Sequence, residues 1–314
     1  MILIRDLFEK TCQTIDIHNP ASSDETLDNC TLEDWVKQHG AEQSALASVK
    51  VWTRAMLGLE PSDMSALFFL DYCKSGGGLI QMRPEKENGG QYFRLTRGEG
   101  NFPVQIKAGT YLKTTRNSSY FAWSRRFIDR RVGCSQLSTA KAQLSKAAKL
   151  GYQVKVILLY ASLWWRAHGL CGLLQSFESP VCITRDSSVE EQKQYSLTCF
   201  ISGKLGIAFS TGTQQARFDS VLEQIKRGYG PFTGGVPEPL AITEHEWSKD
   251  QWAQGCPCPA LPPGVMTGFG HALRTSHGKI HFVGTETSFE WKGYMDGAVR
   301  SGETGAKGGH PDHE

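Results

Sequence analysis

The pattern of apolar and polar positions predicts strands in three parts of the chain. Residues 152–161 form an almost continuous apolar run, which is typical of a buried strand. Residues 195–202 alternate between apolar and polar side chains, as a strand with one buried face does. Residues 280–283 form a shorter apolar run. Gly203 and Gly284 follow the last two runs and mark the ends of these strands.

Other segments carry helical signals. Thr31 has Asp34 three positions on, which predicts an N-cap for one helix with apolar positions as far as Trp52. Gly151 ends a stretch rich in helix formers, and Gly228 closes an amphipathic stretch. The predicted helices lie within 31–52, 137–150, 217–227 and from 298 onward, and residues 66–73 form a further compact apolar run. Strands and helices alternate loosely, so the fold class is mixed α/β (α+β), with a mixed sheet flanked by helices.

Composition and charge exclude several classes of protein. The 314 residues are 39% hydrophobic and 21% charged, which is typical of a globular protein. A net charge of +2 gives no reason to expect nucleic acid or an anionic membrane as partner. The chain contains no run of about 18 apolar residues, so no transmembrane helix is predicted. The N-terminus lacks the pattern of a signal peptide, so we expect an intracellular protein. The sequence does not specify an organelle. The nine cysteines then favour free thiols over disulfides.

The most specific pattern lies near the C-terminus. The strand at 280–283 runs directly into Gly284-Thr285-Glu286, and a short loop leads to a helix start at Gly293-Tyr294-Met295. This stretch closely resembles the C-terminal flavin-binding signature of the flavin-containing monoamine oxidase family. The resemblance implies FAD as cofactor and an oxidoreductase that acts on amines.

By this resemblance, the strand and the helix that follows it hold the flavin between them. The predicted cofactor-binding residues in this stretch are Gly284, Thr285, Glu286, Gly293, Tyr294 and Met295. The Glu286 carboxylate can accept hydrogen bonds from ribityl or ribose hydroxyls, and Gly293 leaves room for the isoalloxazine ring. The N-terminus of the helix favours the negative charge of the reduced flavin. The alternative is a strand–turn–helix unit whose small residues serve packing.

A second match to the family precedes this signature. Trp247 leads to Cys256, and a Pro-Pro-Gly turn follows at 262–264. In the mammalian mitochondrial members, the cysteine at the Cys256 position is bonded to the flavin, so Trp247 and Cys256 are also predicted cofactor-binding residues. The alternative for Cys256 is a free thiol in a loop. Cys256 and Cys258 form a Cys-x-Cys pair, but no second pair of Cys or His residues lies nearby in the sequence. No metal site is therefore predicted.

The strand at 152–161 resembles the family strand that carries a buried lysine. By resemblance, Lys155 contacts the reactive flavin nitrogen N5 through a water molecule and is a predicted catalytic residue. A lysine in an apolar strand is costly unless something compensates its charge, which makes it a better functional candidate than a surface lysine. The alternative is a lysine on an edge strand that points to solvent.

Tyr294 is the second predicted catalytic residue, because the family uses this position as one wall of an aromatic cage around the amine. The opposite wall is commonly aromatic, one residue after the tethering cysteine, but here that residue is Pro257. A preference for simple aryl amines is therefore in doubt. Phe200, Trp291 and Tyr294 are the predicted substrate contacts, although Phe200 and Trp291 also suit a plain core.

Two features depart from the family. The chain has no Gly-x-Gly-x-x-Gly turn for a dinucleotide, so the pyrophosphate half of the cofactor site has no visible provider. Residues 101–136 have seven basic residues against one acid and lack the family's glycine-rich flavin contact. Interleaved aromatic residues allow a nucleic-acid surface there, but a deletion, altered splicing or a frame shift explains the abrupt change better. Whether this segment is genuine remains open.

These observations divide the chain into an irregular lead-in at 1–30, a substrate-binding domain at 31–245, a C-terminal FAD-binding segment at 246–306 and a disordered tail at 307–314. The predicted function is FAD-dependent oxidation of an amine to an imine, with O2 reduced to H2O2. A small amine and O2 are the expected partners, and a homodimer is a further expectation. The alternative is a catalytically inactive remnant that acts as a binding or structural module.

Overall fold

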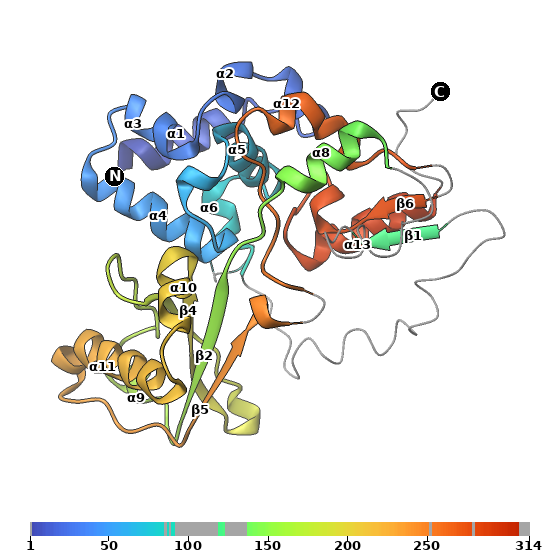
Figure 1. The fold of residues 1–314 in the computed structure, drawn as a ribbon. Helices are drawn as coiled ribbons and strands as arrows, with labels where there is room; N and C mark the ends of the chain where they lie inside the picture. The colour runs from blue at the N-terminus through green and yellow to red at the C-terminus, as the bar shows by residue number, and fades with distance from the viewer. Residues whose placement is uncertain are drawn as a thin grey trace. The chain divides into compact units, whose positions relative to one another are not determined.

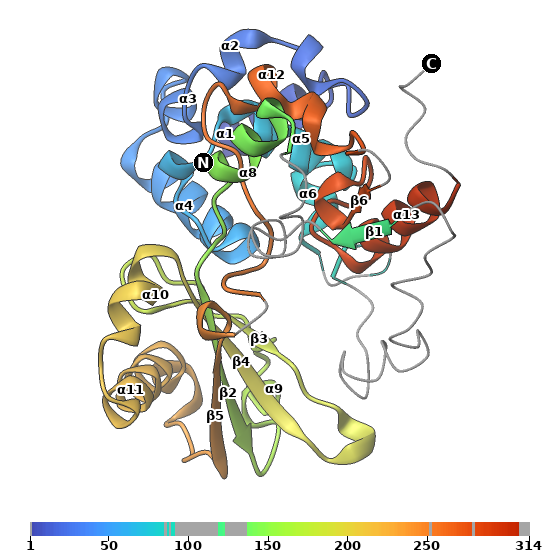
Figure 2. The same ribbon diagram turned by 45° about the vertical axis from the view of Figure 1, so that its right-hand side comes forward.

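The computed structural model describes residues 2–84, 87, 89–91, 119–122, 137–250, 253–277 and 280–307. Backbone contacts divide the chain into two compact units. The first consists of Met1–Ala41, Ser62–Lys149 and Ala260–Glu314, and the second consists of Glu42–Pro61 and Leu150–Pro259. Each unit has its own sheet and its own helices (Figures 1 and 2). The expected mixed α/β class is confirmed.

The first unit is mainly helical. Its helices are α1 (Ile2–Cys12), α2 (Glu25–Asp28), α3 (Leu32–Gln38), α5 (Ala66–Ser75), α6 (Leu79–Met82), α8 (Thr139–Ala147), α12 (Val265–Phe269) and α13 (Met295–Ala306). The ring of Phe8 packs edge-on against Trp35 and Phe69, with centroids 5.2 and 5.7 Å apart. Ile4, Phe8 and Cys12 are buried at helical spacing. The expectation of an irregular lead-in at 1–30 is therefore wrong, because α1 has a stripe of side chains that fits the core.

The single helix expected across 31–52 is two helices, α3 and α4 (Gln43–Leu57). Thr31 caps α3 as predicted, since its side chain accepts a hydrogen bond from the Asp34 N–H. Gly40 then takes a left-handed conformation with φ of +77°. A glycine reaches this region without the steric cost that other residues have there, so the chain turns between the helices.

The sheet of the first unit consists of two parallel strands among the described residues. These are β1 (Ser119–Ala122) and β6 (Ile280–Val283), and Ser119 pairs with Ile280. Strand β6 is the strand predicted at 280–283. Strand β1 lies within the segment 101–136 that departs from the family, and the rest of that segment is outside the described residues. The tail from 308 onward is also outside them.

The second unit is built on a four-stranded antiparallel sheet in the order β3-β4-β2-β5. The strands are β2 (Gln153–Tyr160), β3 (Val181–Asp186), β4 (Tyr195–Ser202) and β5 (Ala241–Glu246). The strands predicted from the two apolar patterns are thus β2 and β4. The helices are α4, α9 (Trp164–Ala167), α10 (Gly203–Ser210) and α11 (Gln214–Thr233), and Figure 2 shows α11 beside the sheet.

Strand β2 has one buried face and one more accessible face. Val154, Val156 and Leu158 are buried in a core that also holds Val221 and Ile225 of α11. The residues between them on β2 face the other side, where burial is lower. This alternation is the period of two that a strand with one covered face requires.

Helix α11 extends beyond Gly228, where the sequence predicted its end. A side chain at Gly228 would have its Cβ 2.8 Å from Leu174 Cδ1, so this glycine allows close packing. Gly234 ends the helix instead, in a left-handed conformation with φ of +68°. The predicted helix at 137–150 ends earlier than expected, because Lys149 forms a bridge with Ala260.

Short 3-10 helices connect the larger elements. They are η1 (Pro20–Ser22), η2 (Pro61–Asp63), η5 (Glu190–Gln192), η6 (Trp247–Lys249), η7 (Gly270–Leu273) and η8 (Thr285–Thr287). In the part of the chain that the structure describes, no helix is both long enough and apolar enough to cross a bilayer. The two compact units do not follow the predicted boundary at 245, because 260–314 joins the N-terminal helices. The functional division between a substrate domain and an FAD segment stays a prediction.

A buried lysine in the first unit gives a test of stability against pH. Lys141 of α8 donates a hydrogen bond to the Ala272 carbonyl at 2.5 Å, and its ammonium lies 3.8 Å from the Phe282 ring centroid. Burial lowers its pKa to about 7. Between that value and the ordinary 10.5, the unfolded chain binds a proton that the folded chain has released. The free energy of unfolding should therefore rise with pH across this window, by on the order of 2–4 kcal/mol.

Lys141→Met should remove this rise, as measured by urea unfolding at pH 7 and pH 9.5. The matched control is Lys146→Met, because Lys146 lies on the same helix and is exposed. Its variant should keep the wild-type pH dependence. Parallel pH profiles for wild type and the Lys141 variant would show that Lys141 keeps its proton in the folded state.

Candidate functional site

The predicted flavin segment forms a closed strand–loop–helix unit. Strand β6 ends at Val283, η8 follows, and α13 begins at Met295 with Tyr294 as its N-cap residue. The Thr285 hydroxyl donates a hydrogen bond to the Tyr294 carbonyl at 2.8 Å. The Gly284 N–H donates to the Ser301 hydroxyl at 2.9 Å. The end of the strand is thus held directly against the start and the middle of the helix.

Two glycines allow this closure. Gly293 has φ of +80°, and a Cβ there would lie 3.0 Å from a ring carbon of Tyr72. A Cβ at Gly297 would lie only 2.2 Å from the Trp291 carbonyl oxygen. Both positions therefore require glycine for a steric reason. The small residues of the motif serve the local fold, whatever further role they have toward a ligand.

Glu286 is the unusual ionisable group of this unit. Among the described residues, no side chain donates a hydrogen bond to its carboxylate and no cation pairs with it. Burial raises its pKa to about 7. Its oxygens lie next to Gly284, where an added Cβ would be 2.8 Å from them. A partly buried carboxylate that no other side chain among the described residues compensates is a suitable acceptor for ligand hydroxyl groups, so it fits the ribose or ribityl part of FAD.

Tyr294 and Trp291 form an aromatic pair in the same unit. Their ring centroids are 5.3 Å apart and the rings are nearly perpendicular, at 74°. The Tyr294 hydroxyl donates to the Met82 carbonyl at 3.2 Å and accepts from the Gln91 side chain at 3.2 Å. Burial raises the pKa of Tyr294 to about 12, so the phenol stays neutral at physiological pH. Met295, by contrast, has half of its surface exposed on α13.

Lys155 occupies the central strand of the second unit. It pairs in register with Phe200 on β4 and with His245 on β5, so it is not on an edge strand. It lies on the less buried face of β2, and its ammonium is 5.4 Å from the Phe200 ring centroid. Among the described residues no carboxylate pairs with it. A partly buried ammonium held over an aromatic ring, without a counterion, can interact with a ligand or a water molecule.

Cys256 and Trp247 also lie in the second unit. The Cys256 thiol is 3.7 Å from the Gln153 side-chain oxygen, to which it donates. Burial raises the pKa of this thiol to about 12, and the charge of Lys155 only partly opposes the shift. The Trp247 ring packs edge-on against His245, with centroids 4.4 Å apart. Pro257, where the family commonly has an aromatic wall, is exposed.

The predicted site residues thus fall into two groups, one in each compact unit. The first unit holds Gly284, Thr285, Glu286, Trp291, Gly293, Tyr294 and Met295. The second unit holds Lys155, Phe200, Trp247 and Cys256. In the second unit Lys155 pairs in register with Phe200, whereas Trp247 and Cys256 lie in the segment after β5. Their roles toward flavin and amine stay predictions.

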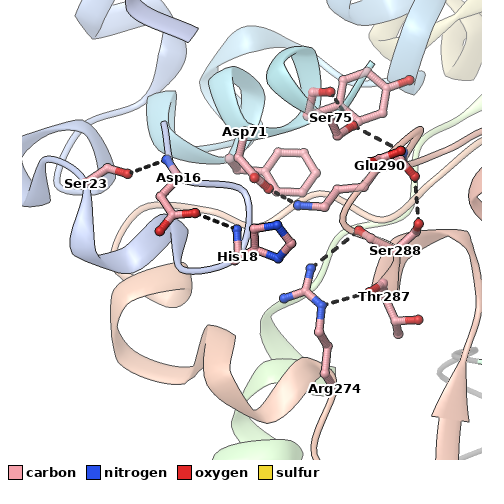
Figure 3. Close-up of polar contacts among 12 residues, drawn as sticks. Asp16, His18, Ser23, Asp71, Ser75, Arg274, Thr287, Ser288 and Glu290 are labelled. Carbon is pink, nitrogen blue, oxygen red and sulfur yellow. Dashed lines mark hydrogen bonds and ion pairs between the residues drawn. The ribbon is translucent and has the colours of Figure 1, made fainter. Parts of the chain in front are cut away.

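The structure adds residues around the flavin segment that sequence reasoning missed. Figure 3 shows Asp71 and Ser75 on α5 facing the loop after η8, and Arg274 reaching that loop from the other side. The Arg274 side chain donates to the carbonyls of Thr287 and Ser288 at 2.8 and 3.4 Å. Asp71 carried a signal in the sequence, since it is the only charged residue in the apolar run at 66–73.

Phe289 lies in the loop after η8, among these surrounding residues. The Arg274 guanidinium is 4.0 Å from its ring centroid, and the His18 ring is 4.6 Å from it. Asp16 orients the His18 backbone through a hydrogen bond of 2.9 Å. The N-terminal segment therefore contacts the flavin loop directly, which the expected irregular lead-in did not suggest.

The family of this chain follows from its similarity to known proteins. The model of the flavin containing amine oxidoreductase family matches residues 129–308, which is more than half of the chain. The chain belongs to this family. The match includes both groups of predicted site residues, so the family's flavin, FAD, is the cofactor to consider for them.

Curated relatives are similar to this chain over most of its length. Amine oxidase [flavin-containing] A of Bos taurus is 25% identical over 89% of this chain and 58% of its own. Putative flavin-containing monoamine oxidase AofH of Mycobacterium tuberculosis is 28% identical over 96% of this chain and 71% of its own. The chain thus spans between about three fifths and seven tenths of these two relatives.

The solved structure of cyclohexylamine oxidase from Brevibacterium oxydans IH-35A has the same fold. It matches with a TM-score of 0.84 and 24% identity, over 96% of this chain and 72% of that one. A putrescine oxidase bound to putrescine matches with the same TM-score and 19% identity. At these identities the likeness establishes the fold of the family and no substrate.

Proposed function

We propose that this chain carries the amine-binding and flavin-binding parts of an FAD-dependent amine oxidase. The observation that carries the proposal is Glu286, a partly buried carboxylate after β6 with no side-chain partner among the described residues, beside a loop that only glycine at 293 and 297 allows. Such a group costs stability in the free protein. A ligand with hydroxyl groups would relieve this cost, and FAD is the ligand that the family uses.

The protein's contributions can be assigned residue by residue. Glu286 would accept hydrogen bonds from the hydroxyl groups of FAD, and the N-terminus of α13 would present its N–H groups to the negative charge of the cofactor. Tyr294, fixed through its hydroxyl to Met82 and Gln91, supplies a rigid aromatic wall for an amine. By the family resemblance, Lys155 would bind a water molecule that serves the flavin chemistry. Bound FAD supplies the redox chemistry, in which the amine becomes an imine and O2 becomes H2O2.

The state of Cys256 bears on how the flavin is held. A thiol reacts as its thiolate, and the raised pKa of Cys256 keeps it protonated at neutral pH. This favours a flavin that is bound without a covalent link. Denaturing the yellow protein would decide the point, because a released flavin means no tether. A flavin that stays on the protein in wild type and is released in Cys256→Ala would instead identify the tether.

The first experiment is the visible spectrum of the purified chain after incubation with FAD and gel filtration. A retained flavin band, with amine-dependent release of H2O2 in the next assay, is the expected result. Amines of different size and charge would then define the substrate, because Pro257 leaves the family's usual aryl preference open. A folded chain that retains no flavin would contradict the proposal for this chain.

A second candidate is a non-catalytic binding module. The observation that favours it is the absence of a Gly-x-Gly-x-x-Gly turn from the sequence, since that turn binds the pyrophosphate of FAD in this class of fold. A chain of this kind stays colourless yet unfolds cooperatively. Adding a separate dinucleotide-binding segment tests the intermediate case, in which flavin binds only when both parts are present.

The expected partners follow from the same proposal. An amine and O2 are the small-molecule partners, and the expected homodimer and intracellular location are parts of the proposal that need their own tests. Light scattering after gel filtration measures the mass in solution. A mass near 34.8 kDa corresponds to a monomer and twice that value to the homodimer.

A further inference from the structure

The loop between η8 and α13 is held by a buried ion pair that the proposed function does not use. Lys292 lies within the loop, and its ammonium contacts the Asp71 carboxylate of α5. Their side chains are 7% and 1% exposed. The two residues are 221 positions apart in the chain. The pair therefore fixes a contact between α5 and the flavin segment that no local interaction could provide.

Stability alone does not account for this pair. Moving two charges out of water carries a large desolvation cost, and apolar residues of similar size often stabilise a protein equally well or better. Asp71 Oδ1 is also buried without a hydrogen-bond partner among the described residues. The carboxylate thus depends on Lys292 for its compensation. In some proteins such buried polar groups select one arrangement of the chain over others.

The backbone around Lys292 is held by the same turn of α5. The Ser75 carbonyl accepts a hydrogen bond from the Trp291 N–H at 2.8 Å. The Ser75 hydroxyl accepts one from the Lys292 N–H at 3.2 Å and donates to the Tyr72 carbonyl at 2.7 Å. Figure 3 shows Asp71 and Ser75 on the side of α5 that faces the loop. The side chain of Lys292 and two consecutive backbone groups are therefore held together.

The conformation that this contact maintains is an uncommon one. Trp291 has φ of +53° and Gly293 has φ of +80°, so left-handed residues lie on both sides of Lys292. For a residue with a side chain, such as Trp291, this region is sterically unfavourable. The Trp291 carbonyl then accepts a hydrogen bond from the Tyr294 N–H at 3.1 Å, which closes the turn before α13. The turn determines where the helix begins and how Tyr294 is presented.

We propose that Asp71 and Lys292 are positioning residues that preset the turn at 291–293 for flavin. They act through Tyr294 and through the first turn of α13, and neither needs to contact the flavin itself. The proposal rests on the proposed function where it names flavin as the ligand. Its structural part, the ordering of the turn by the ion pair, can be measured on the protein without flavin.

The decisive variant is Asp71→Leu combined with Lys292→Met, which replaces both charges with apolar side chains of similar size. Hydrogen exchange followed by mass spectrometry reports on the Trp291 and Lys292 amides. We expect these amides to exchange at least tenfold faster, while the urea midpoint is unchanged or higher. The affinity for FAD, measured by flavin fluorescence, should be at least tenfold weaker. A purely structural role would move stability and flavin affinity in the same direction.

Two further variants complete the test. Lys292→Arg keeps a cation in reach of Asp71 and should restore both slow exchange and flavin affinity. Arg300→Met removes exposed ion pairs from α13, where Arg300 contacts Asp296 and Glu290, and should change neither property. Unchanged exchange at 291–292 in the double variant would overturn the proposal, and so would a parallel fall in overall stability. If wild type itself binds no FAD, the proposed function fails for this chain, and the exchange data still decide whether the pair orders the turn.

Discussion

Lys155→Met is expected to lower the rate of amine oxidation by the flavin-loaded protein at least 100-fold. The ammonium of Lys155 lies on the accessible face of β2, over the Phe200 ring and without a counterion among the described residues. Such a group stabilises charge and holds water where a reaction takes place, and removal of one such donor from an active site typically costs about 10²–10³ in rate. Steady-state kinetics with the preferred amine measure the effect.

The fold should tolerate this substitution. No carboxylate among the described residues depends on Lys155, and methionine keeps the length of its stem, so we expect the urea midpoint to change little. Lys204→Met, which removes an exposed lysine from α10 in the same unit, is the matched control and should keep full activity. Wild-type turnover in the Lys155 variant would remove this residue from the mechanism. A loss of folding would instead identify its role as structural.

Glu286→Gln is expected to have opposite effects on flavin affinity and on the stability of the flavin-free protein. Glutamine is a weaker acceptor than a carboxylate for ligand hydroxyls, and hydrogen bonds to charged groups contribute about 1.5–3 kcal/mol. We therefore expect the affinity for FAD to fall at least tenfold. Without flavin, the variant no longer has a carboxylate that must lose its solvation, so it should unfold at a higher urea concentration above pH 7.

The pH dependence follows from the raised pKa of Glu286. Between the ordinary value of 4.5 and about 7, the folded chain binds a proton that the unfolded chain has lost. The contribution of Glu286 to the free energy of unfolding is then fully present below 4.5 and falls as pH rises towards 7. Glu286 is partly accessible to solvent, so we expect this loss to be on the order of 1 kcal/mol. Urea unfolding at pH 5 and pH 8 measures it.

The difference between wild type and variant should therefore appear at pH 8 and shrink at pH 5. Glu290→Gln is the matched control, because Glu290 lies in the same loop and its side chain is half exposed and paired with Arg300. It should leave both the pH profile and the flavin affinity near those of wild type. Identical profiles of unfolding free energy against pH for wild type and Glu286→Gln would show that the carboxylate is well solvated. Ligand binding would then relieve no desolvation cost at Glu286.

Much of the local structure could be predicted because its causes lie within a few residues of one another. The Thr31 hydroxyl reaches the Asp34 N–H within one turn, so the start of α3 is visible in the sequence. The apolar run at 152–161 and the alternation at 195–202 identified β2 and β4. The run from Gly284 to Met295 indicated a strand, a loop and a helix, and the family match includes it. Each of these signals depends on spacing along the chain.

The errors have a different cause. Gly228 was expected to end α11, but it lies where Leu174 approaches the helix, a contact that only the folded chain creates. The stripe of Ile4, Phe8 and Cys12 in α1 was too short to recognise, and it became a core element because Trp35 and Phe69 cover Phe8. The local sequence thus indicated where helices could form and where they could end. Packing decided which of them were used.

The sequence by itself determined the family, the flavin motif and the candidate residues, because these are properties of residue identity and of short-range spacing. The tertiary structure alone decided which groups support the motif. Asp71 and Lys292 are separated by 221 positions, and nothing in either local sequence indicates that they meet. Their pairing, the left-handed turn at Trp291 and the isolation of the Glu286 carboxylate exist only once the chain is folded. Burial and contact, the physical quantities behind all three, are properties of three-dimensional packing.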